Sequence, residues 1–399
     1  MSLPEGSVTS ARGFRAGVVA AGIKKPGVPD LCVVASDRPA FAAGAFTTNM
    51  VKAAPVYVSR EHLADGRAQA FVVNSGNANA CTHEQGLANA REMASLTAAK
   101  LGLAPTDVLV ASTGVIGVHL PMARIRAGIA AIDLAESAGP AAARAIMTTD
   151  TRPKTAAVEV EIGGITVTIG GMAKGAGMIH PNMATMLSFV TTDAAVESGA
   201  FLKSCLQNAV DDTFNMVTVD GDTSTNDTLI LIANGAAGNP TIVDGTPEAA
   251  LLQEAVKQVC AALAMAVARD GEGATKLIEV SVRGAKSRSD ARRIARTIAV
   301  SPLVKTAVYG ADPNWGRVLC AAGYSGAEVD QERADIIIGD TYLMRSGDPL
   351  PFDKAAASAQ MKGEEVLIGV DLHLGDGEAI AWGCDLTEEY VDINAKYTT

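Results

Sequence analysis

The chain has 399 residues, 48% of them apolar and 19% charged, which is typical of a compact folded protein and excludes a largely disordered one. A formal net charge of −11 argues against DNA or RNA as the main partner, because phosphate binding needs concentrated Lys and Arg. The six cysteines and five histidines are scattered without metal-ligand spacing, so we expect reduced thiols and no metal. The sequence shows no signal-peptide pattern and no uninterrupted apolar run near the roughly 20 residues that span a bilayer, which predicts a cytoplasmic protein.

Short apolar runs and one helical pattern make up the first third of the chain. The helical pattern covers Glu84–Leu101 and is rich in Ala, Leu and Met. Strand-like runs are expected at Leu31–Val34, Pro55–Val58, Phe71–Val73 and Val108–Val110.

A hairpin is predicted in the middle of the chain. Apolar and polar residues alternate over Val158–Ile162 and again over Ile165–Ile169, and Gly163 and Gly164 provide a two-residue turn between them. The alternation indicates one buried and one polar face.

A long helix is predicted after the hairpin. Thr246 is a suitable N-cap, Pro247 a favourable first helical residue, and Gly271 and Gly273 follow its end. Its core-facing stripe consists of Leu252, Val256, Val259, Leu263 and Val267.

The C-terminal part begins with the strand-like run Leu277–Val282, followed by a helical pattern over Ser287–Val300. Turn residues such as Gly375-Asp376-Gly377 indicate a strand-rich end. We therefore expect an α+β protein with a domain boundary near residue 280.

The most informative segment runs from Lys174 to Leu187, where a glycine-rich stretch leads through Pro181-Asn182 to Thr185 at the start of an apolar strand, Met186–Val190. In one interpretation Thr185 is an ordinary β-branched strand residue. In the other, the Thr185 hydroxyl attacks the Ala184–Thr185 carbonyl, and an N→O acyl shift with hydrolysis frees an N-terminal threonine that is both nucleophile and base. Spacing alone leaves both interpretations open.

Several further segments, together with this one, resemble the glutamate N-acetyltransferase / ornithine acetyltransferase family, and they follow in order along nearly the whole chain. These segments are Gly17–Lys24, Val73–Ala80, Ala111–Gly117, Met147–Asp150, Asp222–Asp227, Asp270–Gly273 and Asp312–Arg317.

The resemblance implies a layered αββα sandwich of the N-terminal-nucleophile type with a smaller α/β C-terminal domain, divided as 1–280 and 281–399. It also implies self-cleavage between Ala184 and Thr185 into fragments 1–184 and 185–399. Two copies of each fragment would form a heterotetramer.

The resemblance assigns catalytic or substrate-binding roles to eight residues. Thr185 is the nucleophile, and Thr113 and Gly114 stabilise the oxyanion. The substrate-binding set is Thr148, Lys174, Thr185, Glu272, Asn394 and Thr399. From sequence alone, a solvated surface lysine, a solvated loop carboxylate and a simple strand-to-helix turn are the ordinary alternatives for Lys174, Glu272 and Thr113-Gly114.

Two other features receive no catalytic role. The acidic run Asp220–Asp227 lacks the glycine and glutamate of a calcium loop, so we expect a hydrogen-bonded turn near the active site. His180 adjoins the cleavage segment, but a lone histidine more often packs than catalyses.

The implied reaction is ping-pong transfer of acetyl from N2-acetyl-L-ornithine to L-glutamate in arginine biosynthesis, without a cofactor. Some family members also accept acetyl-CoA as a donor, and the sequence does not distinguish the two types. Two alternatives remain: a self-processing amidohydrolase or aminopeptidase that passes the acyl group to water, and a non-catalytic binding protein that is never cleaved.

Overall fold

The computed structural model describes residues 2–3, 5–180 and 186–396, and its first layer is a four-stranded sheet in the order β1-β2-β4-β5. Only the β4–β5 pair is parallel. The strands are β1 (Phe14–Val19), β2 (Leu31–Ser36), β4 (Ala70–Asn77) and β5 (Val108–Val115).

A five-stranded sheet in the order β3-β9-β8-β7-β6 forms the second layer. The β8–β9 pair is parallel and the other pairs are antiparallel. The strands are β3 (Phe41–Phe46), β6 (Lys154–Ile162), β7 (Ile165–Lys174), β8 (Leu187–Thr192) and β9 (Thr228–Ala233).

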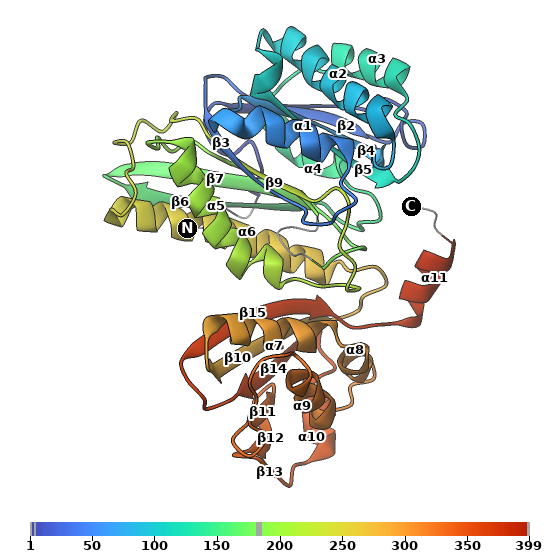
Figure 1. Ribbon diagram of the computed structural model, residues 1–399, viewed down its shortest axis with the longest axis vertical. Helices are drawn as coiled ribbons and strands as arrows, with labels where there is room; N and C mark the ends of the chain where they lie inside the picture. Colours follow the sequence, from blue (N-terminus) through green and yellow to red (C-terminus); the bar gives the residue numbers. More distant parts are fainter. Residues whose placement is uncertain (1, 4, 181–185, 397–399) are drawn as a thin grey trace.

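The two sheets pack face to face, and helices cover both outer faces (Figure 1). Between the sheets, the rings of Phe71 on β4 and Phe189 on β8 stack with centroids 4.3 Å apart. The first sheet carries α1 (Ala54–His62), α2 (His83–Leu101) and α3 (Met122–Ala131), and the second carries α5 (Gly199–Asp212) and α6 (Pro247–Arg269). The expected αββα sandwich is confirmed.

Short elements connect these layers. The helix α4 (Gly139–Ala145) contributes to the core between the sheets. The single-turn helices are η1 (Leu63–Asp65), η2 (Pro105–Asp107), η3 (Glu136–Ala138) and η4 (Phe214–Met216).

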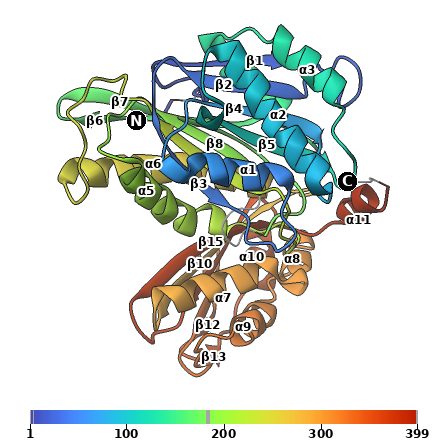
Figure 2. The same ribbon diagram turned by 45° about the horizontal axis from the view of Figure 1, so that its top comes forward.

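A third, six-stranded sheet in the order β13-β12-β11-β14-β10-β15 lies below the sandwich (Figure 2). Its strands are β10 (Leu277–Ala285), β11 (Asp335–Ile338), β12 (Thr341–Arg345), β13 (Asp348–Pro349), β14 (Glu365–Asp371) and β15 (Gly377–Cys384). The accompanying helices are α7 (Arg288–Val300), α8 (Pro302–Tyr309), α9 (Trp315–Gly323), α10 (Lys354–Gln360) and α11 (Glu388–Lys396).

The helix α6 agrees with its prediction at both ends. The Thr246 hydroxyl accepts a hydrogen bond from the Ala249 amide, and the predicted stripe is buried in the core. Among the described residues α6 is the one helix long and apolar enough to cross a membrane by length and composition. Its packing between the second and third sheets is that of a core helix.

Most of the other predicted elements are confirmed, including the hairpin, whose Gly163 and Gly164 both have positive φ. The predicted strand Pro55–Val58 is wrong, because these residues form the start of α1. Pro55 lies in the first turn of that helix, where its missing N–H costs nothing, and a four-residue apolar run does not distinguish a strand from a helix.

Candidate functional site

Six of the predicted site residues line one cavity of about 100 Å³, which we call the Lys174 cavity. They come from β5, the segment before β6, the end of β7, the loop after α6, and α11: Thr113, Gly114, Thr148, Lys174, Glu272 and Asn394. The predicted residues Ala184, Thr185 and Thr399 lie outside the described residues.

Lys174 is buried at the end of β7, with 9% of its surface exposed, so the solvated-lysine alternative is wrong. Its Nζ donates a hydrogen bond to Thr113 Oγ1 over 3.2 Å. Burial lowers the pKa of Lys174, against the opposing effect of the Asp150 carboxylate. The Thr113 oxygen accepts from this nitrogen, which leaves the hydroxyl hydrogen available to a ligand.

Gly114 occupies a position that only glycine fits. Its φ is +132°, and an added Cβ would overlap the backbone of Gly76 on β4, where the β4–β5 pairing becomes irregular. Thr113 and Gly114 lie within the last residues of β5, so the predicted turn after a shorter strand is corrected to an irregular strand end. This end brings backbone and hydroxyl donors to the cavity wall.

Glu272 also lines the cavity and has 8% of its surface exposed, so the solvated-carboxylate alternative is wrong as well. Its backbone N–H donates to the Ala176 carbonyl, and its Oε2 accepts from Asn394 Nδ2 over 2.9 Å. The carboxylate rests against Gly177, where any Cβ would overlap it. These contacts fix Glu272 between the glycine-rich segment and α11.

A buried charge network lies beside the cavity, and the sequence analysis assigned no role to its members. Lys154 Nζ forms ion pairs with Asp150 over 2.6 Å and with Asp270 over 2.5 Å. Asp150 also accepts from the Gly175 amide over 2.6 Å. Burial acts to raise the pKa of Asp150, but Lys174 and Lys154 outweigh this effect and lower the pKa to about 2. The network therefore ties the start of the glycine-rich segment to the end of α6.

The acidic run forms the hydrogen-bonded turn that we expected beside the cavity. Asp220 accepts from the Met178 and Ile179 amides over 2.6 and 2.9 Å, and Ser224, Thr225 and Asn226 line the cavity. Burial raises the pKa of Asp227 well above its ordinary value. The described residues hold no group of three or more side chains suited to a metal ion.

His180 contacts residues from the region of the second sheet and from the region of the third sheet. Its Nδ1 lies 3.0 Å from Thr218 Oγ1, and Arg296 Nη2 on α7 lies 2.9 Å from its Nε2. Burial, assisted by the Arg296 charge, lowers the pKa of His180 to about 4. The imidazole is therefore neutral near pH 7.

The cavity, which has the size of a small molecule, is lined by a buried ammonium group, a buried carboxylate and a hydroxyl donor. This arrangement suits a ligand that carries both a carboxylate and a cationic group. The fold and the site thus define a layered αββα protein with a polar small-molecule cavity.

The chain belongs to the ArgJ family, whose model matches residues 15–399. It is 56% identical to the arginine biosynthesis bifunctional protein ArgJ of Symbiobacterium thermophilum over 99% of both chains. It is 53% identical to the protein of the same name from Dehalococcoides mccartyi, over 100% of this chain and 98% of that one. A crystal structure of the Bacillus halodurans arginine biosynthesis bifunctional protein argJ aligns with a TM-score of 0.51 at 50% identity, covering 52% of this chain and 98% of that chain.

Proposed function

We propose that this chain is a glutamate N-acetyltransferase, or ornithine acetyltransferase, of arginine biosynthesis. The observation that carries the proposal is the Lys174 cavity, which gathers all six described candidate residues in one place. Family membership and 53–56% identity to arginine biosynthesis proteins over nearly the full length support it. The hydrolase alternative is not favoured by these relatives.

The proposed reaction has two acetyl transfers. The Thr185 hydroxyl attacks the acetyl carbonyl of N2-acetyl-L-ornithine, Thr113 and Gly114 stabilise the oxyanion, and the threonine amine carries the proton from the hydroxyl to the departing ornithine nitrogen. L-Glutamate then attacks the acetyl-threonine ester through its amine. N-acetylglutamate leaves, and the hydroxyl of Thr185 is restored.

The walls of the cavity give each substrate charge a partner. Lys174 binds the substrate carboxylate, and Glu272 binds the cationic end of ornithine. Thr148, Asn394 and Thr399 complete the set as further hydrogen-bonding groups. Asn394 acts on Glu272 directly, since its amide already donates to that carboxylate.

Self-cleavage between Ala184 and Thr185 is part of the proposal. The Bacillus halodurans chain matches about half of this chain at nearly its own full length, and residues 185–399 are just over half of the sequence. In sequence, Thr185 stands two residues before β8, whose Leu187 is the register partner of Lys174. Fragments 1–184 and 185–399 would assemble as two copies of each.

Three further points belong to the same proposal. Residues 1–280 form the catalytic domain and 281–399 the smaller domain; β10, the first strand of the third sheet in sequence, begins at Leu277. The enzyme acts in the cytoplasm and requires no cofactor. Acetyl-CoA is the second donor to assay, and the word "bifunctional" in the relatives' names supports that choice.

The test is the intact mass of the denatured protein beside a Thr185→Ala variant. Two fragments of roughly 19 and 22 kDa are expected from the 40.8 kDa chain, and none from the variant. N2-acetyl-L-ornithine should add one acetyl group to the larger fragment, and L-glutamate should remove it as N-acetylglutamate. An uncut chain in both samples would overturn the assignment of Thr185 as the nucleophile. Acetate formation at a rate independent of glutamate would favour the hydrolase.

A further inference from the structure

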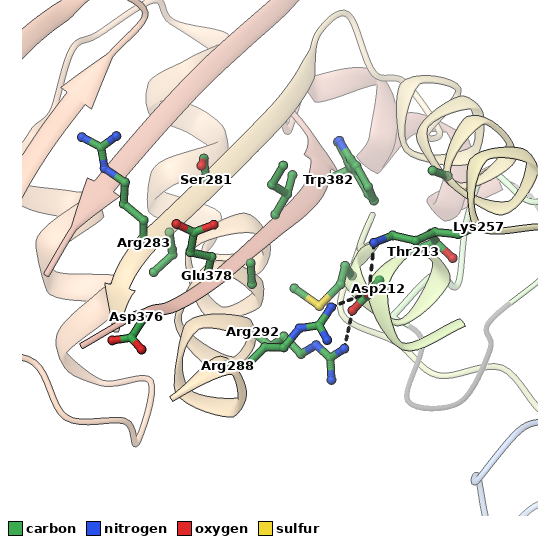
Figure 3. A pocket seen from close by; sticks show the side chains of 15 residues that line it. Asp212, Thr213, Lys257, Ser281, Arg283, Arg288, Arg292, Asp376, Glu378 and Trp382 are labelled. Atoms are coloured by element: carbon green, nitrogen blue, oxygen red, sulfur yellow. Dashed lines mark hydrogen bonds and ion pairs between the residues drawn. The ribbon is translucent and has the colours of Figure 1, made fainter. Parts of the chain in front are cut away.

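A second hollow of about 730 Å³ lies at the seam between the sandwich and the third sheet, and none of the residues discussed above as catalytic or substrate-binding lines it (Figure 3). We call it the Asp212 groove. Asp212 is the last residue of α5, and Lys257 of α6 and Arg288 and Arg292 of α7 all form ion pairs with its carboxylate. Elements far apart in sequence therefore build one wall.

This wall carries an excess of positive charge. Three cations share a single carboxylate, with Lys257 Nζ 3.2 Å from Asp212 Oδ2 and the two arginines on its two oxygens. Burial acts to raise the pKa of Asp212, but its three cationic partners outweigh burial and lower this pKa. The carboxylate therefore stays ionised. One anion leaves about two positive charges uncompensated at the wall, which suits an additional carboxylate or phosphate group.

The opposite wall carries two carboxylates beside Arg283, whose guanidinium is paired with Asp371 over 2.7 Å. Asp376, in the turn before β15, and Glu378 on β15 face the groove from that side (Figure 3). Within the described part of the chain, neither carboxylate forms an ion pair or a side-chain hydrogen bond. This wall suits a cationic group.

The floor between the two walls is mainly apolar. Met216, Val282, Ala379 and Trp382 line it, together with Ile380, which keeps 41% of its surface exposed. An exposed isoleucine on a groove floor is suited to cover by a short hydrocarbon segment.

We propose that the Asp212 groove is a binding site for a small zwitterion, with a carboxylate or phosphate group at Lys257, Arg288 and Arg292, an alkyl spacer over Ile380, and a cationic group at Asp376 and Glu378. The site is independent of the acetyl transfer. A polyanion does not fit, because Asp376 and Glu378 would repel it.

The test is calorimetric titration of the purified full protein with 6-aminohexanoate, which presents both end groups on an alkyl chain. Hexanoate and hexylamine, each with one end group, should bind at least about tenfold more weakly, as expected for loss of one charged contact. O-phosphoethanolamine beside 6-aminohexanoate identifies the preferred anion, and inorganic phosphate alone should bind weakly. Equal binding of the half-molecules, or no binding of either zwitterion, would overturn the proposal.

Variants locate the binding. Arg288→Ala combined with Arg292→Ala should abolish it, and Glu378→Gln should weaken 6-aminohexanoate but leave hexanoate unchanged. Arg293→Ala is the matched control, since Arg293 lies on the same helix but donates to the Gly326 carbonyl outside the groove. These side chains are largely exposed except for Arg292, so folding should survive. Displacement of 6-aminohexanoate by N2-acetyl-L-ornithine would place the binding in the Lys174 cavity instead and overturn the proposal.

Discussion

The Lys174 cavity and the Asp212 groove both bring cations and carboxylates together, and they differ in depth. Lys174 and Glu272 in the cavity, and Asp150 in its supporting network, are each buried and have specific partners. In the groove, Lys257 and Arg288 keep 41% and 61% of their side-chain surface exposed. The larger hollow is the shallower one, so volume alone does not identify the site of chemistry. Burial gives each charge a large individual effect, and exposure leaves water to screen it.

The largest expected difference between the two regions is in stability. Asp150→Ala removes one partner of a buried network and should lower the free energy of unfolding by about 3 kcal/mol or more. Arg288→Ala removes an exposed ion pair and should lower it by less than about 1 kcal/mol. Urea unfolding of both variants measures the difference, and equal losses would contradict the comparison.

Catalysis should be almost as sensitive as stability to a substitution in the cavity. Lys174→Met removes the buried cation that donates a hydrogen bond to Thr113. It should lower kcat/KM for N2-acetyl-L-ornithine roughly 30- to 1,000-fold, which corresponds to about 2–4 kcal/mol of lost transition-state stabilisation. Lys257→Met, in the groove, is the control and should leave kcat/KM unchanged. Steady-state assays of the cleaved enzymes check both. A Lys174→Met enzyme with normal kinetics would remove Lys174 from the site.

A glycine in the cavity should have a smaller effect. Gly177→Ala adds a Cβ where the Glu272 carboxylate now lies, so Glu272 must shift, and KM for N2-acetyl-L-ornithine should rise about tenfold, or 1.4 kcal/mol. Gly323→Ala, where an added Cβ meets nothing within 4 Å, is the matched control and should leave KM unchanged. An unchanged KM for Gly177→Ala would show that Glu272 has room to move.

A pH-dependent effect is expected at His180, which contacts Arg296 on α7. The folded-state pKa of His180 is about 4, below its ordinary value of 6.5, so the unfolded chain takes up the proton first as pH falls. His180 should therefore reduce stability progressively between pH 6.5 and 4 and have no such effect above that range. Urea midpoints at pH 7 and pH 5 should differ less in His180→Gln than in the native protein. An equal difference in both would assign the acid sensitivity elsewhere.

Local signals in the sequence were sufficient for much of the fold. Thr246 and Pro247 begin α6 as their capping chemistry predicts, and Gly163 and Gly164 form the hairpin turn. The run at Pro55 failed because four apolar residues fit either a strand or a helix, and packing against β5 selects the helix. The choice depends on residues more than fifty positions away.

The site was only partly accessible from sequence. Lys174 and Glu272 were recognised through a family resemblance, because a buried lysine and a solvated lysine look alike in a sequence. Asp150 received no role, since its importance comes from Lys154 and Lys174 meeting it in space. Gly177 was noted only as part of a glycine-rich stretch; its role is to leave room for a carboxylate 95 positions further along the chain.

The strand order of the five-stranded sheet has a consequence for the molecularity of unfolding. The strands β8 and β9 follow residue 185 in sequence, and they lie between β3 and β7, which precede it. A cut before Thr185 therefore leaves one fragment's strand pair hydrogen-bonded on both sides by the other fragment. One uncut copy unfolds as a single chain, whereas complete unfolding of one cut copy separates it into two chains. Its melting temperature should therefore rise with protein concentration, and dilution should favour a loss of structure that the uncut chain does not show.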